Sequence, residues 1–198
     1  MHKALKFSSN WNNKMPDRTL NRRLFIKIFA QTALWGAYSA SAFAAIDRLS
    51  ASKRTLLLYN VHTGQKLDAN YFAQGRYQDN ALKKINYVLR DYRTGDIKPI
   101  RRELLDLLYF ISRTLDRPPR FHIISGYRSP ETNAMLRRRS TKVAKNSLHM
   151  EGEAVDIRIP GCDTTWLRGV CMNLKAGGVG YYPKSEFIHV DIGPVRYW

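Results

Sequence analysis

The stretch Ser147-Leu-His-Met-Glu-Gly-Glu-Ala-Val-Asp156 decides how this 198-residue sequence is interpreted, both for its fold and for its chemistry. It contains His149 and ends on Asp156, seven residues further along. A second stretch near the end of the sequence, Glu186-Phe-Ile-His-Val-Asp191, contains His189. Two imidazoles and one carboxylate are a sufficient ligand set for a catalytic zinc ion, because such a site keeps one coordination position for water. If the three side chains converge, the sequence predicts a metal-dependent hydrolase.

The alternation of apolar and polar residues predicts how the three side chains converge. Side chains on a strand point to alternate faces of a sheet, and both stretches are apolar at every second position (Val155, Ile157 and Ile159; Ile188, Val190 and Ile192). Asp156 and His189 are therefore each expected on the face of the strand opposite to these apolar side chains. If the two strands pair in antiparallel fashion, Asp156 and His189 lie side by side, and His149 reaches them from the preceding loop. Taken singly, each is better explained as an ordinary loop or surface residue, whereas the combination favours a metal site.

The rest of the sequence is typical of an α+β domain. Residues 54–61 and 65–67 predict a β-hairpin, and further strands are expected at 121–124, 154–159, 178–182 and 187–191. Helices are expected at 78–92, at 99–115, from Ser129 onwards and at 164–175. Because the helices come first and the strands concentrate late, we predict a small, mainly antiparallel sheet with helices packed against it.

The first 44 residues have the features of a segment that directs export. Arg22 and Arg23 precede an apolar run that extends from Leu24 and closes on Ala42-Phe-Ala44. This order predicts a twin-arginine signal peptide over 1–44, followed by a flexible leader over 45–53 and a domain over 54–198. The expected location is the periplasm. An amphipathic helix or an uncleaved membrane anchor is the alternative; if the signal is cleaved, no stable membrane insertion is expected.

The protein is strongly basic, with a formal net charge of +17. Removal of residues 1–44, which contain seven basic residues and one acid, lowers this charge to +11. Such a charge is typical of nucleic-acid-binding proteins, but export makes nucleic acid an unsuitable target, and we expect no nucleic-acid partner. The abundant anionic polymers outside the cytoplasm belong to the cell wall and the membrane surface, and a basic surface concentrates a protein on them.

The two cysteines, Cys162 and Cys171, lie nine residues apart. An oxidising compartment permits a disulfide, but the residues between them predict a helix, along which nine residues span about 13 Å. Since the Cα atoms of a disulfide lie within about 7 Å of each other, we expect free, mostly buried thiols.

The combined motifs resemble a known family. Ser-x-His-x-x-Gly-x-Ala-x-Asp over 147–156, followed by Glu-x-x-His over 186–189, resembles the zinc D-Ala-D-Ala peptidases and the VanX-like D,D-dipeptidases. Their fold is shared with lysostaphin-type enzymes and the hedgehog signalling domain. Ser125-Gly-Tyr-Arg-Ser129, Gly177-Gly-Val-Gly-Tyr-Tyr-Pro183 and the closing His-Val-Asp-Ile-Gly-Pro-x-Arg-x-Trp198 make the chain most similar to the exported murein endopeptidase K-type subfamily. The resemblance covers 54–198 and includes the twin-arginine leader.

This resemblance implies a role for each motif residue. The zinc ligands of the family are matched by His149, Asp156 and His189. Arg128 matches the arginine that stabilises the polarised carbonyl oxygen, a role suited to a permanently charged group with several donors. Glu186 occupies the position of the general base in the dipeptidase branch. Asp191 is the competing acid, and it is better suited to orienting a ligand.

The function that the resemblance implies is that of a zinc peptidase in the periplasm. Its substrate would be the peptide cross-links of peptidoglycan, and its export would depend on the twin-arginine machinery. The alternative, from a different class, is a non-catalytic cell-wall-binding module that retains the metal. Catalytic motifs of this kind do not indicate which cross-link is preferred.

Overall fold

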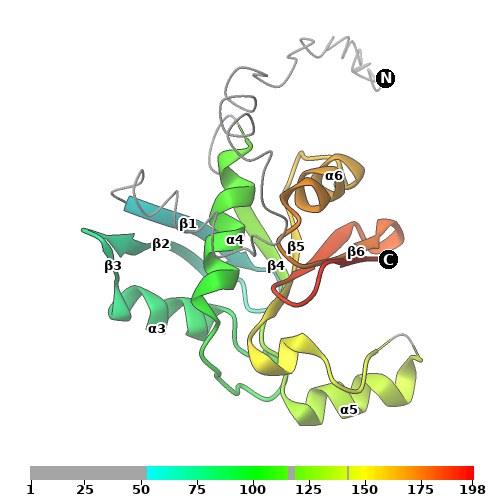
Figure 1. Ribbon diagram of the computed structural model, residues 1–198. Helices are drawn as coiled ribbons and strands as arrows, with labels where there is room; N and C mark the ends of the chain where they lie inside the picture. The colour runs from blue at the N-terminus through cyan, green and yellow to red at the C-terminus, as the bar shows by residue number, and fades with distance from the viewer. Residues whose placement is uncertain (1–52, 116–118, 142) are drawn as a thin grey trace, which may run out of the picture. The chain divides into compact units, whose positions relative to one another are not determined.

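One eight-stranded sheet connects the residues that the computed structural model describes, which are 53–115, 119–141 and 143–198 (Figure 1). Its strands are β1 (Lys53–Asn60), β2 (Lys66–Ala73), β3 (Arg76–Tyr77), β4 (Arg120–Ser125), β5 (Ala154–Arg158), β6 (Gly178–Tyr182), β7 (Phe187–Asp191) and β8 (Arg196–Tyr197). In space they are ordered β3-β2-β1-β4-β5-β7-β6-β8. The N-terminal hairpin and the late strands therefore belong to the same sheet.

The sheet is mixed and larger than the small sheet that the sequence predicts. Five of its seven strand pairings are antiparallel, whereas β1 pairs with β4 and β6 pairs with β8 in parallel. The parallel pairing of β1 and β4 follows from the two helices between them, because a crossover of this length returns the chain in its original direction. The α+β class is confirmed, and the correction concerns the size and the mixed pairing of the sheet.

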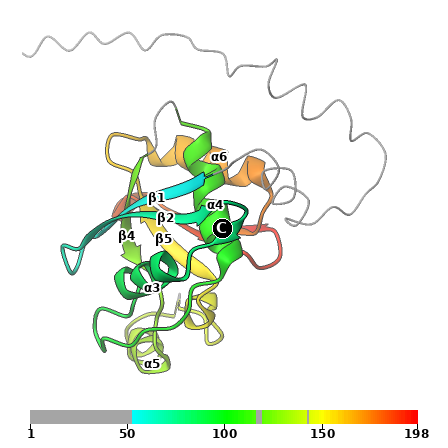
Figure 2. The same ribbon diagram turned by 90° about the vertical axis from the view of Figure 1, so that its left-hand side faces the viewer.

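The described residues form four helices: α3 (Asp79–Val88), α4 (Arg102–Arg113), α5 (Pro130–Arg139) and α6 (Thr164–Leu174). The helices α3, α4 and α6 begin and end within four residues of their predicted positions, and α5 begins one residue after Ser129, where its start is predicted. In Figures 1 and 2, α5 and α6 lie at opposite ends of the described part of the molecule in space, with α4 between them. Two short 3-10 turns, η1 (Leu148–Glu151) and η2 (Pro183–Ser185), precede β5 and β7.

The core face of the sheet has the alternation that the sequence predicts for β5 and β7. Four apolar side chains of these strands are fully buried in one cluster with residues of α4 and α6 (Val155, Ile157, Ile188 and Val190). Cys171 of α6 is buried in the same cluster, and Cys162 is half-buried in the loop before α6; both thiols are free. The polar residues of β5 and β7 are thereby directed to the other face.

The predicted signal peptide, 1–44, and residues 45–52 of the predicted leader lie outside the described residues, so both stay predictions. Lys53, the last residue of that leader, is the first residue of β1. In the part of the chain that the structure describes, no helix is long and apolar enough to cross a membrane.

A buried ion pair holds α4 against the hairpin. Arg54 of β1 donates to Asp106 of α4 over 2.7 Å, and the two side chains are only 0% and 4% exposed. The hydroxyls of Tyr71 and Tyr77 donate to the two oxygens of the same carboxylate over 2.9 and 2.7 Å. Removing the carboxylate therefore takes the ion pair from a buried guanidinium and one hydrogen bond from each of the two phenols.

We expect Asp106→Ala to lower the free energy of unfolding by about 3–5 kcal/mol, since it removes one partner of a buried ion pair. Urea denaturation followed by circular dichroism measures this loss. The matched control is Asp68→Ala, which removes a 2.7 Å ion pair with Arg120 whose side chains are 62% and 33% exposed. An exposed pair contributes about 0–1 kcal/mol. Equal losses in the two variants would contradict the structural role of the buried pair.

Candidate metal centre

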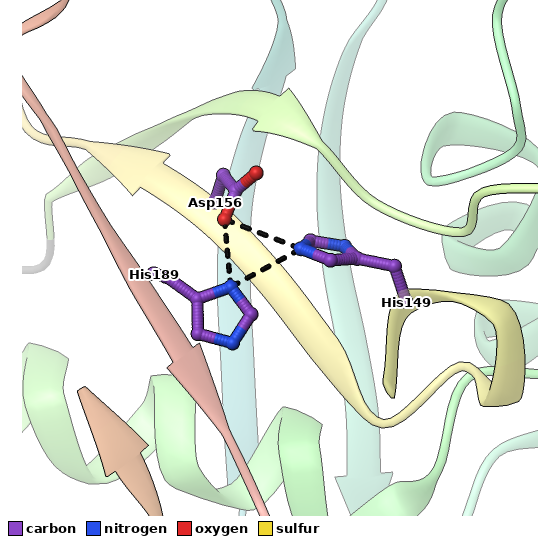
Figure 3. A group of neighbouring side chains, drawn as sticks. All are labelled: His149, Asp156 and His189. Atoms are coloured by element: carbon purple, nitrogen blue, oxygen red, sulfur yellow. Dashed lines mark hydrogen bonds and ion pairs between the residues drawn. The ribbon is translucent and has the colours of Figure 1, made fainter. Parts of the chain in front are cut away.

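The register of β5 and β7 brings two of the three candidate ligands together. Asp156 pairs directly with His189 in the antiparallel ladder, and both side chains are buried on the face opposite the core. His149 approaches from η1, which ends at Gly152 in the left-handed conformation, at a φ of 69°. A Cβ on Gly152 would lie 2.5 Å from the carbonyl oxygen of Pro99, so only glycine fits this turn. Figure 3 shows the three side chains pointing toward one another.

The ligand atoms of the three side chains surround a common centre. His189 Nδ1 lies 2.9 Å from Asp156 Oδ1 and 3.1 Å from His149 Nε2, and His149 Nε2 lies 3.3 Å from Asp156 Oδ1. A tetrahedral zinc ion with bonds of about 2.0–2.1 Å separates its ligand atoms by about 3.3 Å. The residues therefore fit a zinc ion in ligand type, number and spacing.

The outer hydrogen bonds of the two histidines direct their lone pairs inward. His149 Nδ1 lies 2.8 Å from the carbonyl oxygen of Gly126, which can only accept, so this nitrogen is the donor. His189 Nε2 lies 2.9 Å from a carboxylate oxygen of Asp191 and donates to it in the same way. When both rings are neutral, each turns an unprotonated nitrogen toward Asp156. Three acceptors facing one point, without a donor among them, are the arrangement that binds a cation.

The Gly126 carbonyl owes its position to a close approach between β4 and the end of α3. A Cβ on Gly126 would collide with the carbonyl oxygen of Leu89. The next residue, Tyr127, donates its backbone N–H to that same oxygen over 2.7 Å. The absence of a side chain at Gly126 thus allows the backbone to reach both Leu89 and His149.

The electrostatics of the cluster favour an ionised carboxylate and shift the pKa values of the two imidazoles in opposite directions. Burial raises the pKa of Asp156, but His149 and His189 outweigh this effect and hold the pKa well below its usual value. Burial lowers the pKa of His149. Burial also acts to lower the pKa of His189, yet hydrogen bonds to Asp156 and Asp191 raise it to about 9. A cation and a proton therefore compete for the same nitrogen of His189.

Asp191 has the orienting role that the sequence analysis favours. Its carboxylate is fully buried and accepts from the backbone N–H groups of Gly178 and Gly193, each over 2.9 Å. Arg196 adds two hydrogen bonds, of 2.7 and 3.1 Å. Burial raises the pKa of Asp191, but the hydrogen bonds to His189, Gly178 and Arg196 lower it by a larger amount. The pKa therefore lies below its usual value. With its oxygens occupied in this way, Asp191 fixes the His189 ring.

Arg128 lies beside the cluster with donors still available. Its side chain is largely buried, with Nη2 3.8 Å from Asp156 Oδ2 and Nη1 donating to Asn133 Oδ1 over a long 3.4 Å. Its buried Nε has no hydrogen-bond partner within the described residues. Burial lowers the pKa of Arg128 and the neighbouring Asp156 raises it, but a guanidinium remains charged at neutral pH. The structure therefore brings Arg128 together with the three candidate ligands.

Glu186 is not brought to the cluster. It follows η2 in the left-handed conformation, with a φ of 51°, and its side chain is 71% exposed. Its carboxylate accepts from Nη1 of Arg158 over 3.2 Å. The role of Glu186 as the general base stays a prediction.

The cluster lies at the base of a pocket of about 470 Å³. The loop after α5 lines one side of this pocket (Ser140, Val143, Ala144, Asn146, Ser147 and Leu148), together with Arg128. Tyr182, Phe187 and Trp198 line it as well, and the sequence analysis assigned neither Phe187 nor Trp198 a role there. The sequence feature that could have indicated Trp198 is the closing motif, of which it is the last residue.

The comparisons with known proteins identify the family. A family model described as "Peptidoglycan L,D-endopeptidase MepK" matches residues 48–198. The chain belongs to the MepK family, which is a family of peptidases. The predicted resemblance to the murein endopeptidase K-type subfamily is thereby confirmed.

The relatives support this membership over most of the chain. "Peptidoglycan L,D-endopeptidase MepK" of Escherichia coli strain K12 is 43% identical over 157 residues, which cover 79% of this chain and 85% of that protein. "Probable peptidoglycan L,D-endopeptidase MepK" of Haemophilus influenzae is 42% identical over 146 residues, which cover 73% of this chain and 78% of that protein. No solved structure matches the chain at a significant level.

We expect Asp191→Asn to weaken zinc binding by about 10–100-fold while all three ligands remain, because the His189 ring loses its anionic partner. A competition titration with a chromophoric chelator measures the affinity. The control is His62→Ala, which removes an exposed histidine stacked on Tyr92 at 3.8 Å, away from the pocket. An affinity equal to that of the unaltered protein would show that Asp191 does not act on the metal site.

Proposed function

We propose that this protein is a zinc-dependent murein endopeptidase that hydrolyses peptide cross-links of peptidoglycan in the periplasm. The convergence of His149, Asp156 and His189 at the spacing of zinc ligands, in a member of the MepK family, is the observation that carries this proposal. Export by the twin-arginine machinery and cleavage of 1–44 belong to the same proposal. So does a fold of the hedgehog/D-Ala-D-Ala peptidase type for the peptidase domain, 54–198.

The three candidate ligands would determine the charge and the geometry of the metal site. They would hold a zinc ion, which would supply polarisation of a carbonyl group and a water molecule whose pKa is lowered to about 7. Asp156 contributes the negative charge of the ligand set, and its pKa well below the usual value keeps it ionised at neutral pH. His149 and His189 contribute neutral nitrogens whose orientation is fixed by Gly126 and Asp191.

Arg128 is suited to stabilise the carbonyl oxygen of the scissile bond as it becomes negatively charged. Its guanidinium lines the same pocket as the ligands, and its Nε has no partner among the described residues. The neighbouring Asp156 Oδ2, at 3.8 Å, holds the guanidinium close to the reacting centre. A fixed charge of this kind acts most strongly where charge develops in the transition state.

Glu186 is proposed as the general base because it precedes His189 by three residues, as in the dipeptidase branch of the superfamily. To act, its carboxylate must leave Arg158 and turn toward the pocket. That movement costs little, since an exposed ion pair contributes about 0–1 kcal/mol. The proton would pass from the attacking water to Glu186 and then to the departing amine.

The first test is turnover of cross-linked muropeptides by the purified protein. We expect cleavage that stops on addition of a chelator and returns with zinc. We expect His149→Ala to bind no zinc and cleave nothing, because two ligands do not hold the ion. The control, His62→Ala, should keep both properties. Products are separated by chromatography and identified by mass spectrometry. Binding of muropeptides without any cleavage would favour the alternative function, a non-catalytic wall-binding module.

The second test concerns the base. We expect Glu186→Gln to keep its zinc and lower kcat by about 10²–10⁴-fold, the usual contribution of a positioned proton acceptor. Arg158→Gln is the matched control, because it breaks the same ion pair from the other side and should leave kcat unchanged. If both variants cleave at the rate of the unaltered protein, the base lies elsewhere and Glu186 is a surface residue.

A further inference from the structure

The pocket has an aromatic wall on one side of the metal ligands. The rings of Tyr182 and Phe187 stack with centroids 4.5 Å apart, and Trp198 donates its indole N–H to the Tyr182 hydroxyl over 3.0 Å. The indole centroid lies 5.3 Å from that of His189. Trp198 is nevertheless 47% exposed, so much of its ring remains uncovered. An uncovered indole beside a buried metal ligand is a surface available to a substrate.

The backbone fixes where this indole lies. Trp198 accepts from Tyr181 N over 2.9 Å and donates to Val179 O over 3.2 Å, which anchors the residue to β6. Between these two contacts lies Gly180, which pairs with His189 in the β6–β7 ladder. A Cβ on Gly180 would lie 2.7 Å from the indole ring. The glycine therefore leaves the space in which Trp198 lies beside the ligand.

Arg196 couples the wall to the metal centre. Its guanidinium carbon lies 5.1 Å from the centroid of the Trp198 ring, within the range of a cation–π contact. The same guanidinium makes the two hydrogen bonds to Asp191 that help to fix His189. The position of the indole and the orientation of the ligand thus share one arginine.

The pocket also has a polar and cationic side. Arg128 lines it, and Nη2 of its guanidinium lies 3.8 Å from Asp156 Oδ2. The loop after α5 is held in place by Asn133, whose side chain donates to the carbonyl oxygens of Ala144 and Lys145 over 3.1 and 3.2 Å. A pocket with aromatic rings and a guanidinium fits an extended peptide that has an aliphatic segment and a carboxylate or carbonyl oxygen.

We propose that Trp198 is a specificity-determining residue, which packs the aliphatic segment of the bound peptide while Arg128 binds its oxygen. This inference rests on the proposed function and adds a residue that selects the substrate. Aromatic contacts of this kind act on binding more than on the chemical step, because they are the same in the ground state and the transition state. The expected signature is thus a change in KM rather than in kcat.

Trp198→Ala is the first variant. We expect KM for cross-linked muropeptides to rise about tenfold, as for the loss of one aromatic contact surface, with kcat within about threefold and zinc content unchanged. Trp198→Phe should recover part of the loss. The matched control is Tyr197→Ala, which removes a neighbouring aromatic ring that is 41% exposed and does not line the pocket. An unchanged KM in Trp198→Ala overturns the proposal.

Gly180→Ala tests the same wall without altering an aromatic residue. The new methyl group displaces the indole, so KM should rise while zinc content stays the same. In the double variant, Gly180→Ala with Trp198→Ala, the methyl group has nothing to displace, and the two effects should not add. Additive effects would mean that Gly180 acts through another part of the site, and would count against the proposal.

A binding measurement separates this proposal from the proposed function. Calorimetric titration of the zinc-loaded protein with the cleaved, uncross-linked muropeptide needs no turnover. If the unaltered protein binds but never cleaves, and Trp198→Ala binds about tenfold more weakly, the endopeptidase function fails and the binding role of Trp198 stands. If the unaltered protein cleaves and both proteins bind equally, only the role of Trp198 fails. If the unaltered protein neither binds nor cleaves, both fail.

Discussion

The antiparallel register between β5 and β7 is the constraint on which the rest of the site depends. It pairs Asp156 with His189 on one face and Val155 with Val190 on the other. Because side chains alternate along a strand, a slip of one residue would exchange the two faces and separate the ligands. The apolar pair is buried in the core, so the energy that fixes the register comes from hydrophobic burial. The same pairing thus stabilises the fold and brings together the candidate ligands of a metal site.

Hydrogen bonds and a cation–π contact outside the three candidate ligands connect the His189 ring to the aromatic side chain of Trp198 in the pocket. Asp191 joins the His189 ring to the backbone of β6 and to Arg196. Arg196 in turn lies over Trp198, whose backbone is paired with β6. Ligand orientation and pocket shape are therefore parts of one network, and a change at its buried carboxylate affects both.

The convergence of His149, Asp156 and His189 is predictable from the sequence because the relevant signal is local. Alternation within β5 and β7 is enough to place Asp156 and His189 on a common face. Distant or irregular features are not predictable in this way. The buried pair of Arg54 with Asp106 joins residues 52 positions apart, and β8 has only two residues, too few for a periodic pattern that would place Trp198. Glu186 does not line the pocket, and its left-handed backbone conformation is not indicated by its spacing from His189.

The close approach at Gly126 has a consequence for how sequence variation in this family is interpreted. One peptide unit there touches the end of a core helix through Leu89 and holds the His149 ring through its carbonyl. Packing in the core and basicity at the metal are therefore not independent traits. A substitution that shifts the end of α3 by a fraction of an ångström can change the affinity of the candidate site for a cation, although none of the three candidate ligands has been altered. Surveys that compare ligand positions alone would score such a protein as intact.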